Sequence, residues 1–376
     1  MRWLLGSLIV ILAVDCGLPT HVEHGAGDDV ILGVNYFPWY GFEPGTGISV
    51  GGLGSEHWNS NIIDRERRTG ALLGIYDPVV VTPELGFYAS DDADVIAQQV
   101  AWMRATGIDV VMINWWGWGD DDLNGVEDNS GRAAIERATK ALFSHIEQFG
   151  GAIKAFIQSE NWMVPAEQWD AGAPVYVDAT KSQLMWDYVT DEYVNRYPNS
   201  YFEWMGKPLF VSGAPHVLVE DDQARFTYKK IWPVLFSEFD VHQGEMDWSW
   251  VDPAAVSGDL DYKAEVVSED GVVTITNRRD QYWGWIQGLL DRMPDRRDPF
   301  LGDGLGDINW KLVFDASAQV ELVMIQTWND YHEMSFIEPA DNGPLGSKHP
   351  VDLLDKTKYY GDRLKNGESY VDYRAN

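Results

Sequence analysis

Cysteine and positive charge are scarce in this sequence. Cys16 is the only cysteine among 376 residues, so no disulfide can form within the chain. Lys and Arg number 28 against 59 Asp and Glu, which gives a formal net charge of −31. A field of that sign repels polyanions and anionic membrane surfaces. We therefore expect no nucleic acid among the partners, and a solvated acidic surface that favours solubility in saline or extracellular media.

The apolar run at the amino terminus is short. Arg2 is followed by an apolar stretch over residues 3–14, which is the layout of a secretory signal. At about 12 residues this stretch is too short to span a bilayer comfortably. We therefore expect no transmembrane span.

Cys16 follows directly after this stretch, where a lipoprotein signal places its acylated cysteine. Asp15, however, stands where such signals have a small residue, so plain secretion and a lipid anchor at Cys16 both stay open. We predict a signal peptide or lipoprotein signal over residues 1–20 and a tether over residues 21–29. The predicted location is secreted, periplasmic, or at the cell surface as a lipoprotein.

Spacings that bind metal ions are absent or incomplete. The 8 histidines show no H-x-x-x-H spacing and cysteines are not paired, which argues against a zinc site. Residues 120–125 match the first half of a calcium loop, but Gly131 stands where such a loop has its bidentate Glu. Calcium at Asp120–Asn124 stays open, with a solvated acidic loop as the simpler interpretation. We predict no metal and no cofactor.

Aromatic residues, in contrast, are abundant. The chain has 18 Trp and 17 Tyr, more than a core needs, and many of them lie beside Gly, Asn or Asp. Sugar rings stack their C–H faces on such side chains while their hydroxyls bond to neighbouring polar groups. The excess of aromatics therefore indicates a carbohydrate ligand.

Short apolar runs alternate with helical patterns along the chain. Helices are predicted from Ser90, as N-cap, to Gly107, over residues 132–148 and over residues 180–196. The predicted strands are residues 30–34, 108–113, 153–157, 208–211, 234–236, 246–250, 272–275 and 322–325.

Continuous apolar strands separated by helices indicate a parallel sheet covered on both faces. About eight such units predict a single α/β domain over residues 30–376, a (β/α)8 barrel of the TIM type with long βα loops. The alternative, an open doubly wound sheet, is disfavoured because no Gly-rich phosphate loop follows the first strand.

Polar and aromatic residues follow the predicted strands at their carboxyl ends, which converge on the active site in a barrel. The residues after the first three strands are Tyr36, Trp39 and Tyr40; Asn114, Trp115, Trp116 and Trp118; and Glu160. We predict that all of them contact the substrate, with Glu160 positioning a substrate hydroxyl.

Residues 327–333, Thr-Trp-Asn-Asp-Tyr-His-Glu, follow the last predicted strand and carry the strongest functional signal. Asp330 and Glu333 are three residues apart, and glycosidic bond cleavage uses a pair of carboxylates. Side chains at i and i+3 in a tight turn come within ~5–6 Å, close to the ~5–5.5 Å of retaining glycosidases. An extended backbone would separate them further, so this distance stays open. We predict Glu333 and Asp330 as the catalytic pair.

Further substrate contacts are predicted around this pair. Trp328, Asn329 and His332 lie within the same motif. His57-Trp58 lies in the first long loop, and Trp248 belongs to an Asp-Trp-Ser-Trp run that is placed to line the opposite wall.

Several blocks resemble the endo-α-mannosidases of glycoside hydrolase family 99 and the related WbsX-like proteins. The blocks are Tyr36-Phe37-Pro38-Trp39-Tyr40-Gly41, His57-Trp58, residues 83–91, Ile157-Gln158-Ser159-Glu160, and Trp328-Asn329-Asp330-Tyr331-His332-Glu333 with Ile337-Glu338. They occur in the family's order between residues 30 and 340.

The resemblance implies a (β/α)8 barrel that cleaves α-linked mannose chains with retention. Glu333 would be the general acid/base, and Asp330 would deprotonate the sugar 2-hydroxyl so that an anhydro-sugar intermediate forms. The family pattern has Glu at position 330 and His at position 158, where this chain has Asp330 and Gln158. Thr327 to Tyr331 also resembles the α-1,3-glucanases of family 71, which carry Asp-x-x-Glu at a similar place.

Three hypotheses follow. The leading one is a secreted, endo-acting glycoside hydrolase for an α-linked oligo- or polysaccharide, mannosidase-like or, as the alternative, an inverting α-1,3-glucanase-like enzyme. The second is a glycan-binding protein on a barrel without activity. The third is a role in building surface polysaccharide, which the signal sequence disfavours because it separates the chain from cytoplasmic sugar nucleotides.

Overall fold

The computed structural model of the protein describes thirteen segments of the chain. They are residues 30–41, 82–86, 88–118, 130–160, 175–213, 216–234, 248–251, 271–276, 310–311, 313–315, 320–330, 336–341 and 351–373. The predicted signal and tether, residues 1–29, lie outside them.

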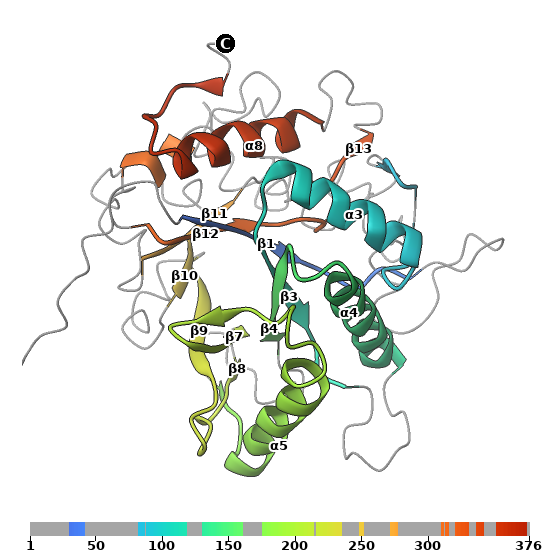
Figure 1. Ribbon diagram of the computed structural model, residues 1–376. Coiled ribbons are helices and arrows are strands. Elements are labelled where there is room, and N and C mark those ends of the chain that lie inside the picture. The colour runs from blue at the N-terminus through green and yellow to red at the C-terminus, as the bar shows by residue number, and fades with distance from the viewer. Residues whose placement is uncertain are drawn as a thin grey trace, which may run out of the picture.

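A large sheet of parallel strands forms the centre of the fold (Figure 1). Its strands are β1 (Ile31–Tyr36), β3 (Val110–Trp115), β4 (Lys154–Glu160), β7 (Lys207–Gly213), β9 (Thr227–Val234), β10 (Trp248–Val251), β11 (Val272–Thr276) and β12 (Leu322–Gln326). Neighbours pair in the order β10-β9-β7-β4-β3-β1-β12-β11, and each of these pairs is parallel.

The order of the strands follows the chain around the sheet. Starting at β1, the path runs through β3, β4, β7 and β9 to β10, and it returns to β1 through β11 and β12. The two end strands, β10 and β11, approach each other to within 8 Å between Cα atoms. The sheet therefore curls round on itself, although no ladder joins β10 to β11 among the described residues.

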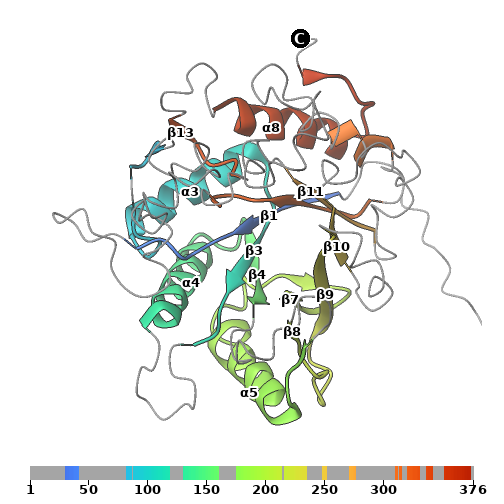
Figure 2. The ribbon, with the colours of Figure 1, turned by 180° about the vertical axis from the view of Figure 1, so that it is seen from behind.

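Helices cover the convex face of this curled sheet. Figures 1 and 2 show α8 (Val351–Lys365), α3 (Ala93–Thr106), α4 (Ser130–Gln148) and α5 (Ala179–Val189) following one another around the outside of the strands. We call this helix-bearing side the outer face and the concave side the inner face. Strands covered on both sides should be apolar throughout, and every residue of β3 and β12 is buried.

The remaining elements are short. A π-helix, η4 (Thr190–Val194), continues α5. The strands β2 (Thr82–Pro83) and β13 (Ala340–Asp341) pair antiparallel, β5 (Val175–Tyr176) pairs parallel with β8 (His216–Val217), and β6 (Glu203–Trp204) pairs antiparallel with β7. The pairing of β2 with β13 joins the segment before α3 to the segment after β12.

Most of the predicted elements are confirmed, with three corrections. Asp92, not Ser90, is the N-cap of α3, and its side chain accepts from the backbone N–H of Asp94 and Val95. Ser90 instead accepts from the backbone N–H of Tyr40 at 3.0 Å. The C-cap is Gly107, as predicted, with the left-handed φ of 84° that glycine adopts without strain.

The second and third corrections concern one strand and one helix. The strand predicted over residues 234–236 coincides with β9 at Val234, and residues 235–236 lie outside the described segments. Residues 227–233 of β9 were not predicted as a strand, because Lys229 and Lys230 interrupt the apolar run. The helix α8 was not predicted at all. Among the described residues, no helix combines the length and the apolarity that crossing a membrane requires.

Candidate functional site

Four neighbouring strands bring the described part of the predicted site together. Residues 37–40 follow β1, residues 116–118 follow β3, Glu160 ends β4, and residues 327–330 follow β12. These strands are parallel neighbours in the order β4-β3-β1-β12, so their carboxyl ends lie along the same edge. We call this the carboxyl edge. Active sites of parallel α/β folds form at such an edge.

Asn329 fastens the segment after β12 to the segment after β1. Its Oδ1 accepts from the Phe37 N–H at 2.8 Å, and its Nδ2 donates to the Phe37 carbonyl at 3.0 Å. The same Nδ2 donates to the Tyr88 hydroxyl at 3.3 Å, and the Tyr40 hydroxyl donates to the Asn329 carbonyl at 2.6 Å. These bonds use both ends of the amide for holding the loop.

Asp330 therefore directly follows Asn329, whose position is held by these hydrogen bonds. It is only 2% exposed, and its backbone N–H donates to Thr327 Oγ1 at 2.8 Å. The Trp328 N–H donates to the Asn35 carbonyl at 2.6 Å, and the Trp328 carbonyl accepts from the Glu338 N–H at 2.8 Å. The peptide bond between Gln326 and Thr327 is cis. Thus the backbone of residues 327–330 is held on both sides.

A buried carboxylate, Glu338, supports this loop from behind. It has no exposed surface, and it accepts from the Tyr88 hydroxyl at 2.7 Å and from Gln99 Nε2 at 2.8 Å. Gln99 in turn accepts from the Tyr36 hydroxyl at 2.8 Å. Burial, and then the charge of Glu338, raises the pKa of Tyr36, so this hydroxyl stays protonated and donates.

Glu160 and Asn114 form a second polar pair at the carboxyl edge. Asn114 Nδ2 donates to Glu160 Oε1 at 2.7 Å, and Asn114 Oδ1 accepts from Trp116 Nε1 at 2.7 Å. Glu160 is partly exposed, whereas Asn114 and Trp116 are buried. Asn114 thereby fixes both the carboxylate and the indole ring.

The aromatic residues of the edge pack on one another. The ring of Trp39 lies 4.2 Å from that of Phe37 and 5.6 Å, edge to face, from that of Trp116. The ring of Tyr40 lies 5.8 Å, edge to face, from that of Tyr88. Such T-shaped contacts suit the quadrupoles of aromatic rings. All five rings are buried.

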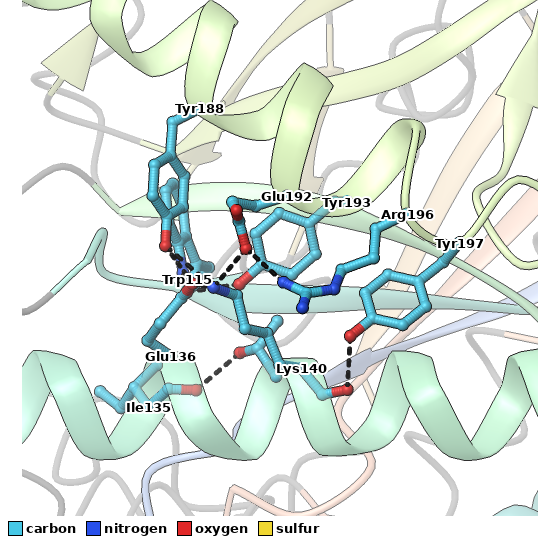
Figure 3. Close-up of polar contacts among 10 residues, drawn as sticks. Trp115, Ile135, Glu136, Lys140, Tyr188, Glu192, Tyr193, Arg196 and Tyr197 are labelled. Atoms are coloured by element: carbon cyan, nitrogen blue, oxygen red, sulfur yellow. Dashed lines mark hydrogen bonds and ion pairs between the residues drawn. The ribbon is translucent and has the colours of Figure 1, made fainter.

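Trp115 lies on the outer face, away from the inner-face residue Asn114. Its indole Nε1 donates to Glu136 of α4 at 2.6 Å, and its ring stacks on Tyr188 at 6.0 Å between centroids. Figure 3 shows the hydroxyls of Tyr188 and Tyr193 converging on the same carboxylate. We therefore interpret Trp115 as a residue that anchors β3 to the helices.

Trp118 connects this outer cluster to the carboxyl edge. Its ring lies 4.6 Å from that of Tyr188 and 6.1 Å from that of Trp115. Gly117, with φ of 90°, makes the turn between Trp116 and Trp118 without strain. The two rings can therefore be held in different surroundings although one residue separates them.

Several predicted site residues lie outside what the structure describes. They are His57, Trp58, His332 and Glu333, together with the side chain of Trp248, whose backbone begins β10. The distance between Asp330 and Glu333 therefore stays a prediction. The possible calcium loop, Asp120–Asn124, is likewise outside. Within the described segments, no three His, Cys, Asp or Glu side chains are grouped to hold a metal ion.

Sequence reasoning missed the residues that hold the loop in place. Gln99 lies on the buried face of α3, where a polar side chain in the sequence signals a buried hydrogen bond. Tyr88 and Glu338 lie in blocks that carry the family resemblance, but no role was predicted for either. Their contact spans 250 residues of sequence, so local patterns do not reveal it.

The fold is similar to that of a solved glycoside hydrolase. The family 99 endo-α-mannosidase of Bacteroides thetaiotaomicron, known also in complex with bis-tris-propane, has a TM-score of 0.57 at 17% sequence identity. The similarity covers 90% of this chain and 99% of that one. A glycoside hydrolase-like protein has a TM-score of 0.44 at 12% identity, covering 94% of this chain and 98% of that one.

No protein-family model matches the sequence, and no curated protein matches it either. At 17% identity, the similarity to the endo-α-mannosidase shows a shared fold. The family resemblance predicted from short motifs is thus confirmed at the level of the fold.

Proposed function

We propose that the protein is a secreted glycoside hydrolase that cleaves α-linked glycans internally, in the manner of an endo-α-mannosidase. One observation carries the proposal: a firmly held, buried Asp330 follows a parallel strand in a fold that an endo-α-mannosidase shares. Paired carboxylates at this edge are the groups that glycoside cleavage requires. The net charge of −31 favours neutral glycans over anionic ones.

We also propose that the curled sheet closes into a complete (β/α)8 barrel. Its eight parallel strands follow chain order, and β10 and β11, which closure would join, already lie within 8 Å of each other. In a closed barrel the carboxyl ends of all eight strands would surround one site.

In the proposed reaction Glu333 gives its proton to the glycosidic oxygen as the bond from the anomeric carbon to that oxygen breaks. Asp330 takes the proton of the sugar 2-hydroxyl, and the freed oxygen attacks the anomeric carbon to form an anhydro sugar. Water then opens this ring: Glu333 takes the proton of water, and Asp330 returns its proton to the 2-oxygen. The sum is addition of one water with retained configuration.

The second candidate reaction is inverting hydrolysis of an α-glucan. It is favoured by Asp330 itself, which is one methylene shorter than Glu and reaches about 1.5 Å less far. In that reaction Asp330 activates water directly, which needs the two carboxyl groups about 6.5–9.5 Å apart. The anomeric configuration of the first product decides between the two reactions.

We propose Glu160, Asn114, Trp116 and Trp39 as contacts for the sugar, with His57, Trp58, Trp248 and His332 retained as candidates from sequence. Trp118 is left out of this set because its ring packs on Tyr188 and Trp115. Tyr36, Tyr40, Trp328 and Asn329 act in the same proposal by holding the loop after β12. A lipid anchor at Cys16 is part of the same proposal as secretion.

The function is tested by replacing the proposed acid. Wild type is incubated with yeast α-mannan and α-1,3-glucan, and product size and anomeric configuration are recorded. Glu333→Gln should lower turnover about 10²- to 10⁴-fold and leave glycan binding nearly unchanged. Glu321→Gln removes the same charge at the amino end of β12 and should leave turnover unchanged. Equal turnover by wild type and Glu333→Gln would refute the assignment.

A further inference from the structure

Gln158 of β4 is a buried amide with no hydrogen-bond partner among the described residues. Its side chain has no exposed surface, and within the described part of the chain neither Nε2 nor Oε1 is bonded. Nearly all buried polar groups in folded proteins are hydrogen-bonded, so an amide with both ends unpaired requires an explanation. One such explanation is a group that the amide binds.

The Gln158 side chain lies on the inner face of the sheet, directly below Glu160. Asn114 and Gln158 are partners in register, and side chains in register lie on the same face. Asn114 bonds to Glu160 on that face, whereas Trp115, one residue further along β3, bonds to α4 on the outer face. Gln158 therefore faces the inside of the curl, one layer beneath the partly exposed carboxylate.

Gly213 on the neighbouring strand β7 leaves the space that the amide occupies. A Cβ at position 213 would lie 2.8 Å from Gln158 Nε2 and 3.3 Å from Glu160 Cγ. Any side chain there would push on the amide. Glycine at position 213 therefore leaves room for the Gln158 amide.

Two further amides on the inner face are half-satisfied. Asn35 Nδ2 donates to Gln326 Oε1 at 2.8 Å, but Asn35 Oδ1 and Gln326 Nε2 have no partner in the segments that the structure describes. Asn35 is in register with Met112, which lies two residues before Asn114 and so on the same face. Unpaired amide atoms thus recur on the inner face of β12, β1 and β4, below the carboxyl edge.

We propose that the Gln158 amide binds a hydroxyl group of the saccharide held beside Glu160, and that it thereby selects the sugar. This inference rests on the proposed function. A sugar hydroxyl is both donor and acceptor, and the amide offers two N–H donors and one carbonyl acceptor. The amide carries no charge, so it suits a neutral hydroxyl. A site built to bond a hydroxyl rejects strongly any analogue without it, because a buried group is then left unpaired.

The test uses the stability and the binding of Gln158→Leu together. If the amide serves the ligand, an apolar side chain of similar size should raise Tm by about 1–3 °C, because it removes an unpaired buried group. The same change should weaken binding of yeast α-mannan by about 10- to 100-fold. An amide that stabilises the fold would instead give a lower Tm.

Ser159→Ala is the matched control. Ser159 Oγ is buried and likewise unpaired among the described residues, but its register with Trp115 places it on the outer face. Its loss should not lower Tm and should leave glycan binding unchanged. A fall in Tm for Gln158→Leu, or unchanged binding, would overturn the inference.

Binding is measured by affinity electrophoresis in a Glu333→Gln background, and cleavage is measured separately in chains that retain Glu333. If the wild type binds mannan or α-1,3-glucan without cleaving either, the proposed hydrolase fails, while weaker binding by Gln158→Leu still supports the inference. If cleavage occurs and Gln158→Leu cleaves and binds as the wild type does, the inference alone fails. If neither glycan is bound, both are overturned.

Discussion

At the scale of single residues, Tyr88 connects the two halves of the support behind Asp330. Its hydroxyl donates to Glu338 at 2.7 Å and accepts from Asn329 Nδ2 at 3.3 Å. Glu338 holds α3 through Gln99, and Asn329 holds the segment after β1. One phenol oxygen therefore links the helix before β3 to the loop after β12.

Replacing Tyr88 by Phe should loosen this loop without touching the proposed sugar contacts. The change takes one donor from a buried carboxylate, so we expect a loss of about 1–3 kcal/mol in the free energy of unfolding. Displacement of Asp330 should lower kcat about 10- to 100-fold and leave KM nearly unchanged. Urea unfolding and steady-state kinetics on mannan measure the two effects.

Tyr201→Phe is the control for this prediction. Tyr201 is also buried, and its hydroxyl donates to the Leu209 carbonyl at 3.0 Å, far from the carboxyl edge. The Tyr201→Phe variant should have a lower free energy of unfolding than wild type but the same kcat. If both variants keep kcat, the bond from Tyr88 does not position Asp330.

At the scale of elements, a charge cluster joins α4 to η4. Lys140 Nζ lies 2.9 Å from Glu136 and 2.7 Å from Glu192, and Arg196 Nη1 lies 2.6 Å from Glu192 (Figure 3). Burial alone would lower the pKa of Lys140, but the two carboxylates more than offset this and raise it. The cation thus stays charged and bridges the helices.

The stability of this junction should depend on acid pH. The hydrogen bond from Lys140, opposed in part by burial and assisted by the charges of Lys140 and Arg196, lowers the pKa of Glu192 below its usual 4.5. A depressed folded-state pKa stabilises the fold above the unfolded value and loses that contribution as pH falls through the folded value. Glu192→Gln should therefore show a smaller fall in Tm than wild type between about pH 6 and pH 3.

Asp191→Asn is its control, because it removes the same charge from the same turn while bonding at 3.3 Å to the neutral Asn195. Its fall in Tm over this pH range should match that of wild type. Identical profiles for wild type and Glu192→Gln would show that the ion pairs with Glu192 add no stability.

The sequence predicted those elements whose burial leaves a local pattern. The strands β1, β3, β4, β7, β11 and β12 are continuous apolar runs, and Gly107 is recognisable as a helix end. Residues 227–233 of β9 were missed because Lys229 and Lys230 interrupt the apolar run. Ser90 and Asp92 are both good N-caps, and only the bonds from Asp94 and Val95 distinguish them.

The candidate site was predictable in its location but not in its support. Asp330, Glu160 and Asn114 follow apolar runs and could be placed at strand ends. The different roles of Trp115 and Trp116 could not be predicted, because the two residues look alike in sequence although their side chains lie on opposite faces. The pairing of Glu338 with Tyr88 depends on a fold that brings residues 250 positions apart into contact.

At the scale of the whole molecule, α8 is one of the helices of the outer face (Figures 1 and 2). Tyr360 has no exposed surface and stacks on Trp310 at 5.4 Å and on Tyr370 at 5.6 Å. Lys365 Nζ donates to Asp109 Oδ2 at 2.5 Å, and the same oxygen accepts from the Leu32 N–H at 2.8 Å. The last helix is therefore tied to the starts of β1 and β3.

A chain that ends at residue 350 should consequently lose its cooperative fold. Removing α8 uncovers Trp310 and the outer face of β1, and the loss of several buried side chains exceeds the stability of a typical domain. We expect no near-UV circular dichroism signal and no sharp urea transition. A chain that ends at residue 373 keeps α8 and should unfold as the full chain does. A sharp transition in the shorter chain would show that α8 is dispensable.

The position of β1 between β3 and β12 has a consequence for how the protein is made. The residues of β1 and β3 are synthesised early. The other neighbour of β1 is β12, which is complete only after Gln326 has been added. The edge of β1 that pairs with β12 therefore stays unpaired through most of translation. Such an exposed flank is a template for pairing with other chains, so chains that stop short of β12 should associate with one another more readily than the full chain does.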